Sequence, residues 1–161
     1  MNNKLRRISI LIVFTCSAFL LSLVADKRSY QTECVSLETD GYVTIKIWDT
    51  KKGAKYNPDQ ARQDAIRALL YSGIAGTNGC TTQPPLLSNL DDQNKFKNIE
   101  RSFWSKKGKW VNFTRNSATE TTIPKIIADK NWKVYQVTVS RNELRKYLEE
   151  QQIIKSLNNG F

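Results

Sequence analysis

Residues 42–48 read YVTIKIW, and the alternation in this stretch decides the fold class. The valine and the two isoleucines fall on one side of an extended chain, and the residues between them fall on the other. The pattern predicts a half-buried β-strand. Tyr42 and Trp48 lie on its second side, so a helix, the preceding segment or a binding partner is expected to cover these two rings.

A well-marked helix start follows this strand. Asn57 suits the N-cap, Pro58 suits the first helical position, and Gln60 completes a variant of the capping box. Gly73 is placed to end the helix. The inward positions recur at helical spacing and are small or apolar: Ala61, Ala65, Ala68 and Leu69. An alanine-rich stripe of this kind lets a helix lie close to a sheet.

The remaining patterns complete an α+β fold. They predict a helix at 91–104, a short strand at 110–113, a short extended piece at 123–128, a strand at 132–139 and a helix that begins at Ser140. The apolar residues of 153–161 predict that the C-terminus packs back on the domain. We therefore expect a small antiparallel or mixed sheet with about three helices packed on it, in the order strand, helix, helix, strand, strand, helix.

The N-terminus predicts export. Lys4, Arg6 and Arg7 precede an uncharged run over residues 8–25, which is typical of a signal peptide or an N-terminal membrane anchor (residues 1–25). By the positive-inside rule the three cations remain on the cytoplasmic side, so the domain that follows is expected to cross the membrane. Acylation of Cys16 is a third possibility for this segment. We expect an exported protein of the periplasm or cell envelope that contacts the membrane through residues 1–25 if they are not removed.

Two cysteines lie beyond this segment, and they predict a disulfide. Residues 26–38 are polar and without periodicity, which is typical of a leader, and residues 39–161 form a single domain. Cys34 would tie the end of the leader to Cys80, since an even number of cysteines in an exported protein favours pairing. Two free buried thiols are the alternative. Two cysteines without any histidine are too few for the usual zinc site, so we expect neither a metal nor another cofactor.

The chain has no histidine, and this excludes most common catalytic plans. Paired carboxylates remain as candidates for a hydrolase: Asp91-Asp92, Glu149-Glu150, and the trio Asp40, Asp49 and Asp59. The first pair is explained by a helix N-terminus and the second by the solvent side of the last helix. We therefore expect no catalytic residues and no enzymatic activity.

Aromatic and basic residues interleave after the second predicted helix. The chain is basic, with a net charge of +10, or +7 once residues 1–25 and their three cations are removed. The one cluster of lysines alternates with large rings and forms the candidate ligand surface: Trp104, Lys106, Lys107, Lys109 and Trp110. Such a surface suits an anionic glycan or a lipid headgroup; nucleic acid is not an expected partner. The competing interpretation is that the rings fill the edge of a small core.

Four segments carry a resemblance to a known family. They are DGYVTIKIWD with the alanine-rich helix after it, YSGIAG with the GC and PPLL loop, FWSKKGKWVNF, and LRKYLEEQQIIKSLNNGF. Over residues 34–161 the chain resembles a family of small exported proteins of unknown function from Bacteroidota. The first strand and helix are also loosely similar to a domain of small envelope lipoproteins and of a flagellar assembly protein. These resemblances imply a compartment and a role in assembly.

Our leading hypothesis is a non-enzymatic envelope component that binds another envelope component, namely a protein. The main alternative is a small binding module for an anionic glycan or lipid, which would use the candidate ligand surface. A carboxylate-dependent hydrolase is the third hypothesis.

Overall fold

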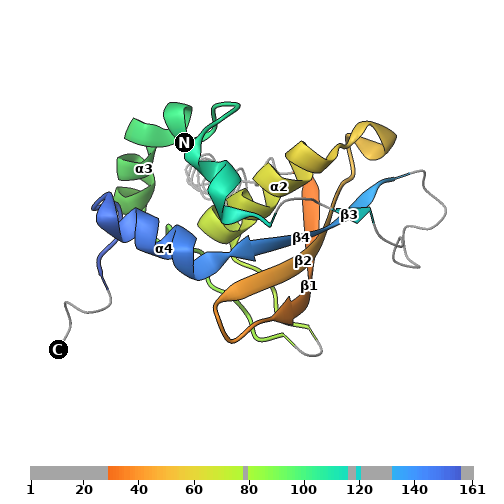
Figure 1. Cartoon of the computed structure of the whole chain (residues 1–161), viewed down its shortest axis with the longest axis horizontal. Helices are drawn as coiled ribbons and strands as arrows, with labels where there is room; N and C mark the ends of the chain where they lie inside the picture. The colour runs from red at the N-terminus through yellow and green to blue at the C-terminus, as the bar shows by residue number, and fades with distance from the viewer. Residues whose placement is uncertain (1–28, 78–79, 116–118, 121–131, 157–161) are drawn as a thin grey trace, which may run out of the picture.

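The computed structural model describes residues 29–77, 80–115, 119–120 and 132–156, which form a small α+β fold (Figure 1). The sheet has the strand order β1-β2-β4-β3, and its strands are β1 (Tyr30–Leu37), β2 (Tyr42–Asp49), β3 (Thr119–Glu120) and β4 (Val134–Ser140). The α-helices of the described part are α2 (Pro58–Arg67), α3 (Leu90–Phe103) and α4 (Arg141–Glu150). Helix α2 packs directly on β2 and β4, and α3 and α4 extend this layer side by side at one end of the molecule.

The strand predicted at 42–48 is β2 in the interior of the sheet, but it is not half-buried: Thr44 and Trp48 on its second side are only 4% and 8% exposed. It pairs antiparallel with β1 on one side and with β4 on the other, where Ile45 lies opposite Val137. All pairs of the sheet are antiparallel, so the mixed alternative does not apply. The valine and both isoleucines of β2 are buried under α2, as the alternation predicts. Trp48 on the other side is 8% exposed and packs with Val134 and Trp132.

The segment predicted to be an irregular leader contains a strand. β1 forms a hairpin with β2, and Gly41 in the turn has a φ of 85°, where a side chain would collide with Asn142. The strand is mostly polar and lies at an edge of the sheet, with a register shift between Cys34 and Ser36. Tyr30, Cys34 and Leu37 pack in or against the core, but the register shift interrupts their alternation, and for this reason β1 has no regular alternating pattern in the sequence.

The predicted capping box starts α2. The Asn57 side chain accepts a hydrogen bond from the Gln60 backbone at 3.0 Å, and the Gln60 side chain accepts one from the Asn57 backbone at 3.3 Å. Ala61 and Ala65 are fully buried against the sheet. The helix continues as a π-helical turn, η2 (Ala68–Ser72), and ends at Gly73 as predicted, with a φ of 72°.

The strand predicted at 110–113 is wrong. Lys109–Phe113 forms a 3-10 helix, η3, and another short one, η1 (Gly53–Lys55), follows β2. Residues three apart share a face in a 3-10 helix but point to opposite faces in a strand. Trp110 and Phe113 are therefore both buried in the same core, which a strand would not allow.

Of the other predicted segments, part of the C-terminal one is described by the structure and the rest are not. Ile153 and Ile154 are buried, which confirms for this stretch that the chain packs back on the domain. The extended piece at 123–128, the export segment 1–25 with Cys16, and residues 157–161 lie outside the described residues. Among the residues that are described, no helix is both long and apolar enough to cross a membrane.

The predicted disulfide joins Cys34 to Cys80, with 6.1 Å between their Cα atoms. It connects the edge strand β1 to the loop between η2 and α3. The hydroxyl of Thr77 adds a hydrogen bond of 3.0 Å to the carbonyl oxygen of Cys34. Since disulfides persist in oxidising compartments, this bond indicates an exported location.

Removal of the disulfide is expected to destabilise the protein strongly. The bond closes a loop with a sequence separation of 46 residues, so its loss in the Cys34→Ala/Cys80→Ala variant should lower the free energy of unfolding by about 4 kcal/mol, through the entropy of the unfolded chain. Urea unfolding of both proteins measures this change. A thiol reductant should lower the midpoint of the wild type and leave the variant unchanged; equal midpoints for the two oxidised proteins would contradict a stabilising role.

Candidate functional site

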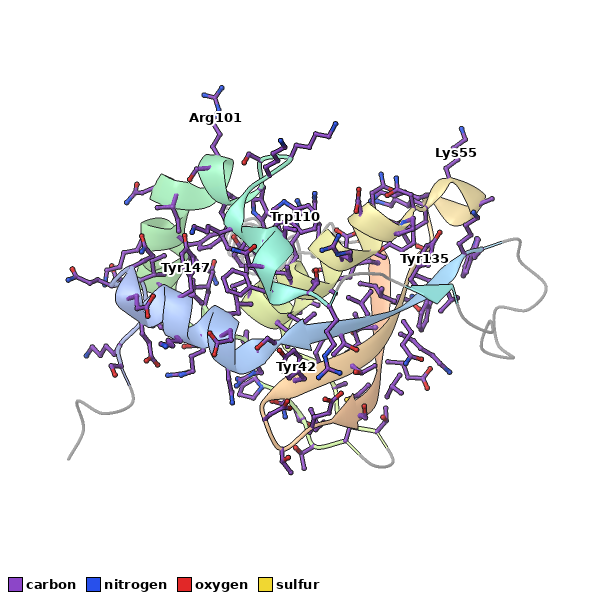
Figure 2. The ribbon with its side chains drawn as sticks, viewed as in Figure 1. Tyr42, Lys55, Arg101, Trp110, Tyr135 and Tyr147 are labelled. Carbon is purple, nitrogen blue, oxygen red and sulfur yellow. A yellow bond between two sulfur atoms is a disulfide. The ribbon has the colours of Figure 1, made fainter. Side chains whose placement is uncertain are left out.

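The structure separates the two tryptophans of the candidate ligand surface from its lysines. Trp110 is 3% exposed, and its indole N–H donates a hydrogen bond of 2.9 Å to the carbonyl oxygen of Ser105 (Figure 2). Trp104 is half-buried and packs edge-on against Phe103 at 4.8 Å between ring centroids. Both indole rings therefore belong to the edge of the core, as in the competing interpretation.

Two arginines of α2 cover these rings. The guanidinium carbon of Arg67 lies 4.4 Å from the Trp104 centroid, and that of Arg62 lies 5.1 Å from the Trp110 centroid. Cation–π contacts of this kind contribute about 0.5–2 kcal/mol each. A sugar ring that stacked on either indole would have to displace the arginine, so the tryptophans are poorly placed to bind a glycan.

The three lysines, in contrast, surround an open hollow of about 300 Å³ between the end of α3 and η3. All three are exposed. We call this hollow the lysine pocket, and the described residues that line it are Lys106, Lys107, Gly108, Lys109, Val111 and Asn112. It retains the basic half of the candidate ligand surface without the aromatic half.

Asp49 is one of two buried aspartates at the junction of β2 and α2. It is 1% exposed, and one carboxylate oxygen accepts hydrogen bonds from the backbone N–H groups of Lys51 and Lys52 at 2.8 and 2.9 Å. The other oxygen accepts a bond of 2.7 Å from the Ser29 hydroxyl and lies 3.4 Å from the Lys52 ammonium. Burial alone would raise the pKa of Asp49, but these hydrogen bonds and the nearby cation hold it below its ordinary value.

Asp64 is the second buried carboxylate. It accepts hydrogen bonds from the Arg67 guanidinium at 2.9 Å and from the Tyr56 hydroxyl at 3.2 Å, and the Lys52 ammonium lies 3.5 Å away. Burial, followed by the negative charge of Asp64, strongly raises the pKa of the Tyr56 hydroxyl, so Tyr56 stays protonated as a donor. Lys52 thus contacts both aspartates, and every carboxylate oxygen of the pair has a partner. This arrangement joins the end of β2 to α2.

Asp64 and Lys52 carry no local sequence signal of this pairing. Asp64 lies one position before Ala65 in the helical pattern, so the spacing alone gave it no clear side. The available signal was a charged residue next to the buried stripe of an amphipathic helix, which needs a partner when it is buried. The partner comes from a loop 12 residues earlier in the chain, and local periodicity does not reveal it.

Most of the other candidate carboxylates form ion pairs with neighbouring cations. The ion pairs are Asp59 with Arg62 at 3.5 Å, Asp91 with Lys95 at 2.8 Å, Glu149 with Arg145 at 2.9 Å, and Asp40 with Arg115 at 4.0 Å. Asp92 contributes to the cap of α3, since its backbone N–H and its side chain both bond to Asn89. In the described part of the chain no group of three or more side chains could hold a metal ion.

A second hollow lies at the opposite end of α3. We call it the α3–α4 groove; it holds about 500 Å³ between the first turn of α3, the loop before it, and α4 with the residues that follow. One wall carries Asp91, Asp92 and Lys95, which pairs with Asp91 at 2.8 Å. The other carries Lys155 and Arg145, which pairs with Glu149 at 2.9 Å. This groove was not predicted, because it forms only where α3 and α4 meet.

The floor of the groove is apolar. Pro85, Leu86 and Ile154 line it, and the last two are almost fully buried, at 4% and 8% exposure. Leu90, between the lining residues Asn89 and Asp91, is 76% exposed, the highest value among the large apolar side chains of the described residues. The apolar floor between two polar walls matches the apolar centre and polar rim of a protein interface, and Leu90 lies at its edge.

Comparison of the chain with protein-family models, with curated proteins and with solved structures finds no match. The geometry of the two hollows is therefore the basis for an inference about function.

The burial and the contacts of Asp49 predict how the free energy of unfolding depends on pH. Asp49→Asn should lower the free energy of unfolding at pH 7 by about 1–3 kcal/mol, since hydrogen bonds to a charged acceptor are lost. The folded pKa of Asp49 is lowered, so its stabilisation is complete above the unfolded pKa, near 4, and is lost as pH falls from about 5 towards the folded value. Between about pH 5 and pH 3 the wild type should therefore lose stability more steeply than the variant.

Denaturant unfolding across this pH range measures both effects. Asp59→Asn is the matched control, because the side chain of Asp59 is 75% exposed, and its effect at pH 7 should stay within about 0.5 kcal/mol. Parallel pH profiles for the wild type and Asp49→Asn would show that the buried carboxylate does not contribute as its contacts suggest.

Proposed function

We propose that this protein is an exported, non-enzymatic component of the cell envelope or periplasm, an accessory to assembly that binds another envelope protein through the α3–α4 groove. The observation that carries the proposal is the groove itself, with walls of opposite charge, an apolar floor and an exposed leucine at its edge. Such a surface is complementary to a protein segment that carries both charge signs and an apolar side chain.

The charges of the groove favour a protein over a polyanion. Lys95 on the α3 wall pairs with Asp91 at 2.8 Å, so Asp92 leaves this wall one net negative charge, which would disfavour an anionic glycan or lipid surface that approached Arg145 and Lys155 on the opposite wall. A protein segment can place a basic residue beside the aspartates and an acidic residue beside the cations. The groove thus supports the leading hypothesis more strongly than the glycan or lipid alternative.

A further cation, Arg141, lies beside the groove without lining it. Arg141 lies one helical turn before Arg145 on α4, is partly buried, and donates a hydrogen bond of 3.3 Å to the carbonyl oxygen of Pro84. It has no ion pair with a carboxylate among the described residues. Burial, followed by repulsion from Arg145, lowers the pKa of Arg141. An acidic side chain of a partner would relieve this repulsion.

The walls of the groove are held in place before any partner arrives. The backbone N–H groups of Leu86 and Leu87 donate to the carbonyl oxygens of Leu69 and Leu70 at 2.9 Å, which fixes the loop to η2. The Gln93 side chain donates a bond of 3.2 Å to the carbonyl oxygen of Leu87. A preformed groove loses little conformational entropy on binding, which favours recognition of a partner by a small surface.

Site-specific photocrosslinking in intact cells tests the proposal. A photoreactive amino acid in place of Leu90 should form a discrete, protease-sensitive adduct with one envelope protein, because this side chain borders the groove. The additional substitution Lys155→Glu should reduce the adduct several-fold, since it reverses the charge of an exposed residue on the basic wall. Western blotting and mass spectrometry of the adduct provide the readout.

The matched control places the same photoreactive group at Lys55, which is exposed in η1 and points away from the body of the molecule at the end opposite α3 and α4 (Figure 2). This position should form no such adduct. Equal crosslinking at both positions, no adduct at position 90, or an adduct that is insensitive to Lys155→Glu would each reject the groove as the binding surface.

A further inference from the structure

We propose that the lysine pocket binds a phosphate group, presented by an anionic lipid headgroup or by a soluble phosphate ester. This site is separate from the α3–α4 groove, since the two hollows lie at opposite ends of α3, a helix of 14 residues and thus about 21 Å in length. The inference goes beyond the proposed function and does not depend on it.

The first argument is the unbalanced charge of the pocket. Lys106, Lys107 and Lys109 have no carboxylate within ion-pair distance in the described part of the chain. The nearby Arg67, which lies over Trp104, is in contrast paired with Asp64 at 2.9 Å. Three neighbouring cations without counterions create a local positive potential, which an anion would neutralise.

The dipole of α3 does not account for these lysines. A cation near the C-terminus of a helix is favourable, but the effect is confined to the last turn. Arg101 already occupies the last turn of α3, which ends at Phe103. Lys107 and Lys109 lie four and six residues beyond that end, on the turn that leads into η3.

The turn that carries the lysines is firmly held. The backbone N–H of Gly108 donates a hydrogen bond of 2.8 Å to the carbonyl oxygen of Ser105, and the Ser105 hydroxyl donates one of 2.9 Å to that of Ser102. The indole N–H of Trp110 bonds to the carbonyl of Ser105 as well. A side chain at Gly108 would collide with the carbonyl oxygen of Phe103, so the turn lies directly against the end of α3. The ammonium groups thus extend from a fixed backbone.

The size and lining of the pocket favour a phosphate group. A volume of about 300 Å³ is at the lower end of the range for small-molecule sites, which suits a headgroup and not a larger apolar ligand. Lysine binds phosphate as a point charge. The described residues that line the pocket contain no aromatic ring on which a sugar or a base could stack, because Trp104 and Trp110 are covered by Arg67 and Arg62.

Binding to the intact exported protein tests the inference in two arms. Isothermal titration calorimetry with glycerol phosphate measures a soluble ester, and cosedimentation with phosphatidylglycerol vesicles, against phosphatidylcholine vesicles, measures a lipid headgroup. We expect saturable binding in at least one arm. This binding should weaken as the salt concentration rises, and its affinity should fall at least tenfold in Lys106→Glu/Lys107→Glu/Lys109→Glu. Each lysine replaced singly by glutamine should cost about threefold to tenfold in affinity.

The matched control is Lys55→Glu/Lys97→Glu/Lys146→Glu, which changes the net charge equally at exposed lysines of η1, α3 and α4 and keeps the same N-terminal segment. It should retain at least half of the wild-type affinity, and both variants should keep the wild-type melting temperature. Lysine-dependent binding in the first arm alone identifies a soluble ester, and in the second alone a lipid headgroup. An equal loss in both variants, or no saturable binding in either arm, would overturn the inference.

The outcome is distinguishable from that of the groove. The triple substitution in the lysine pocket should leave the photocrosslink at position 90 unchanged. If that crosslink fails while phosphate binding persists, the proposed protein-binding function is wrong and the anion site stands. The reverse result would reject the anion site alone.

Discussion

The close contact between α2 and the inner side of β2 and β4 determines the rest of the structure. Ala61, Ala65 and Ala68 are fully buried there, so the helix can approach the strands closely, and a larger side chain at these positions would force the two elements apart. The same position of α2 places Arg67 over Trp104 and Arg62 over Trp110. It also brings Asp64 to Lys52, which joins the helix to the end of the central strand. The two indole rings are therefore covered, and do not form a stacking site, because of how α2 lies on the sheet.

The part of this arrangement that depends on local pattern could be predicted from the sequence. The alternation of β2 and β4, the capping box of α2 and the burial of its alanine face all follow from residues that are close together in the chain. β1 could not be predicted in this way, because a register shift interrupts the alternation of its apolar residues and because its pairing with β2 and its bond to Cys80 are not local. The 3-10 helix η3 was missed because four residues do not distinguish a period of two from a period of three, and only the core shows that Trp110 and Phe113 share a side.

The candidate surfaces also differ in whether they depend on local or on distant residues. The three lysines of the pocket are adjacent in the sequence, so their cluster was visible, whereas the role of the neighbouring rings depends on arginines about 40 residues away in the chain. The α3–α4 groove has no local signal at all. Its lining comes from two segments, residues 85–95 and 145–155, and the acidic pair alone is explained by the N-terminus of α3. A binding surface built from such distant segments is accessible only from the fold.

A cluster of aromatic rings fixes the two hollows relative to each other. Phe103, at the end of α3, packs on Phe96 of the same helix, on Phe113 of η3 and on Tyr147 of α4, with ring centroids 5.1 to 6.1 Å apart. The lysine pocket therefore belongs to the same rigid unit as the walls of the groove. The disulfide acts on this unit from the other side, since Cys80 restrains the loop that continues into Pro85 and Leu86 on the groove floor. Export to an oxidising compartment thus stabilises the segment from which the proposed protein-binding surface is built. If the phosphate group bound at the far end of α3 belongs to a lipid, the rigid unit would also hold that surface at a fixed orientation to the membrane.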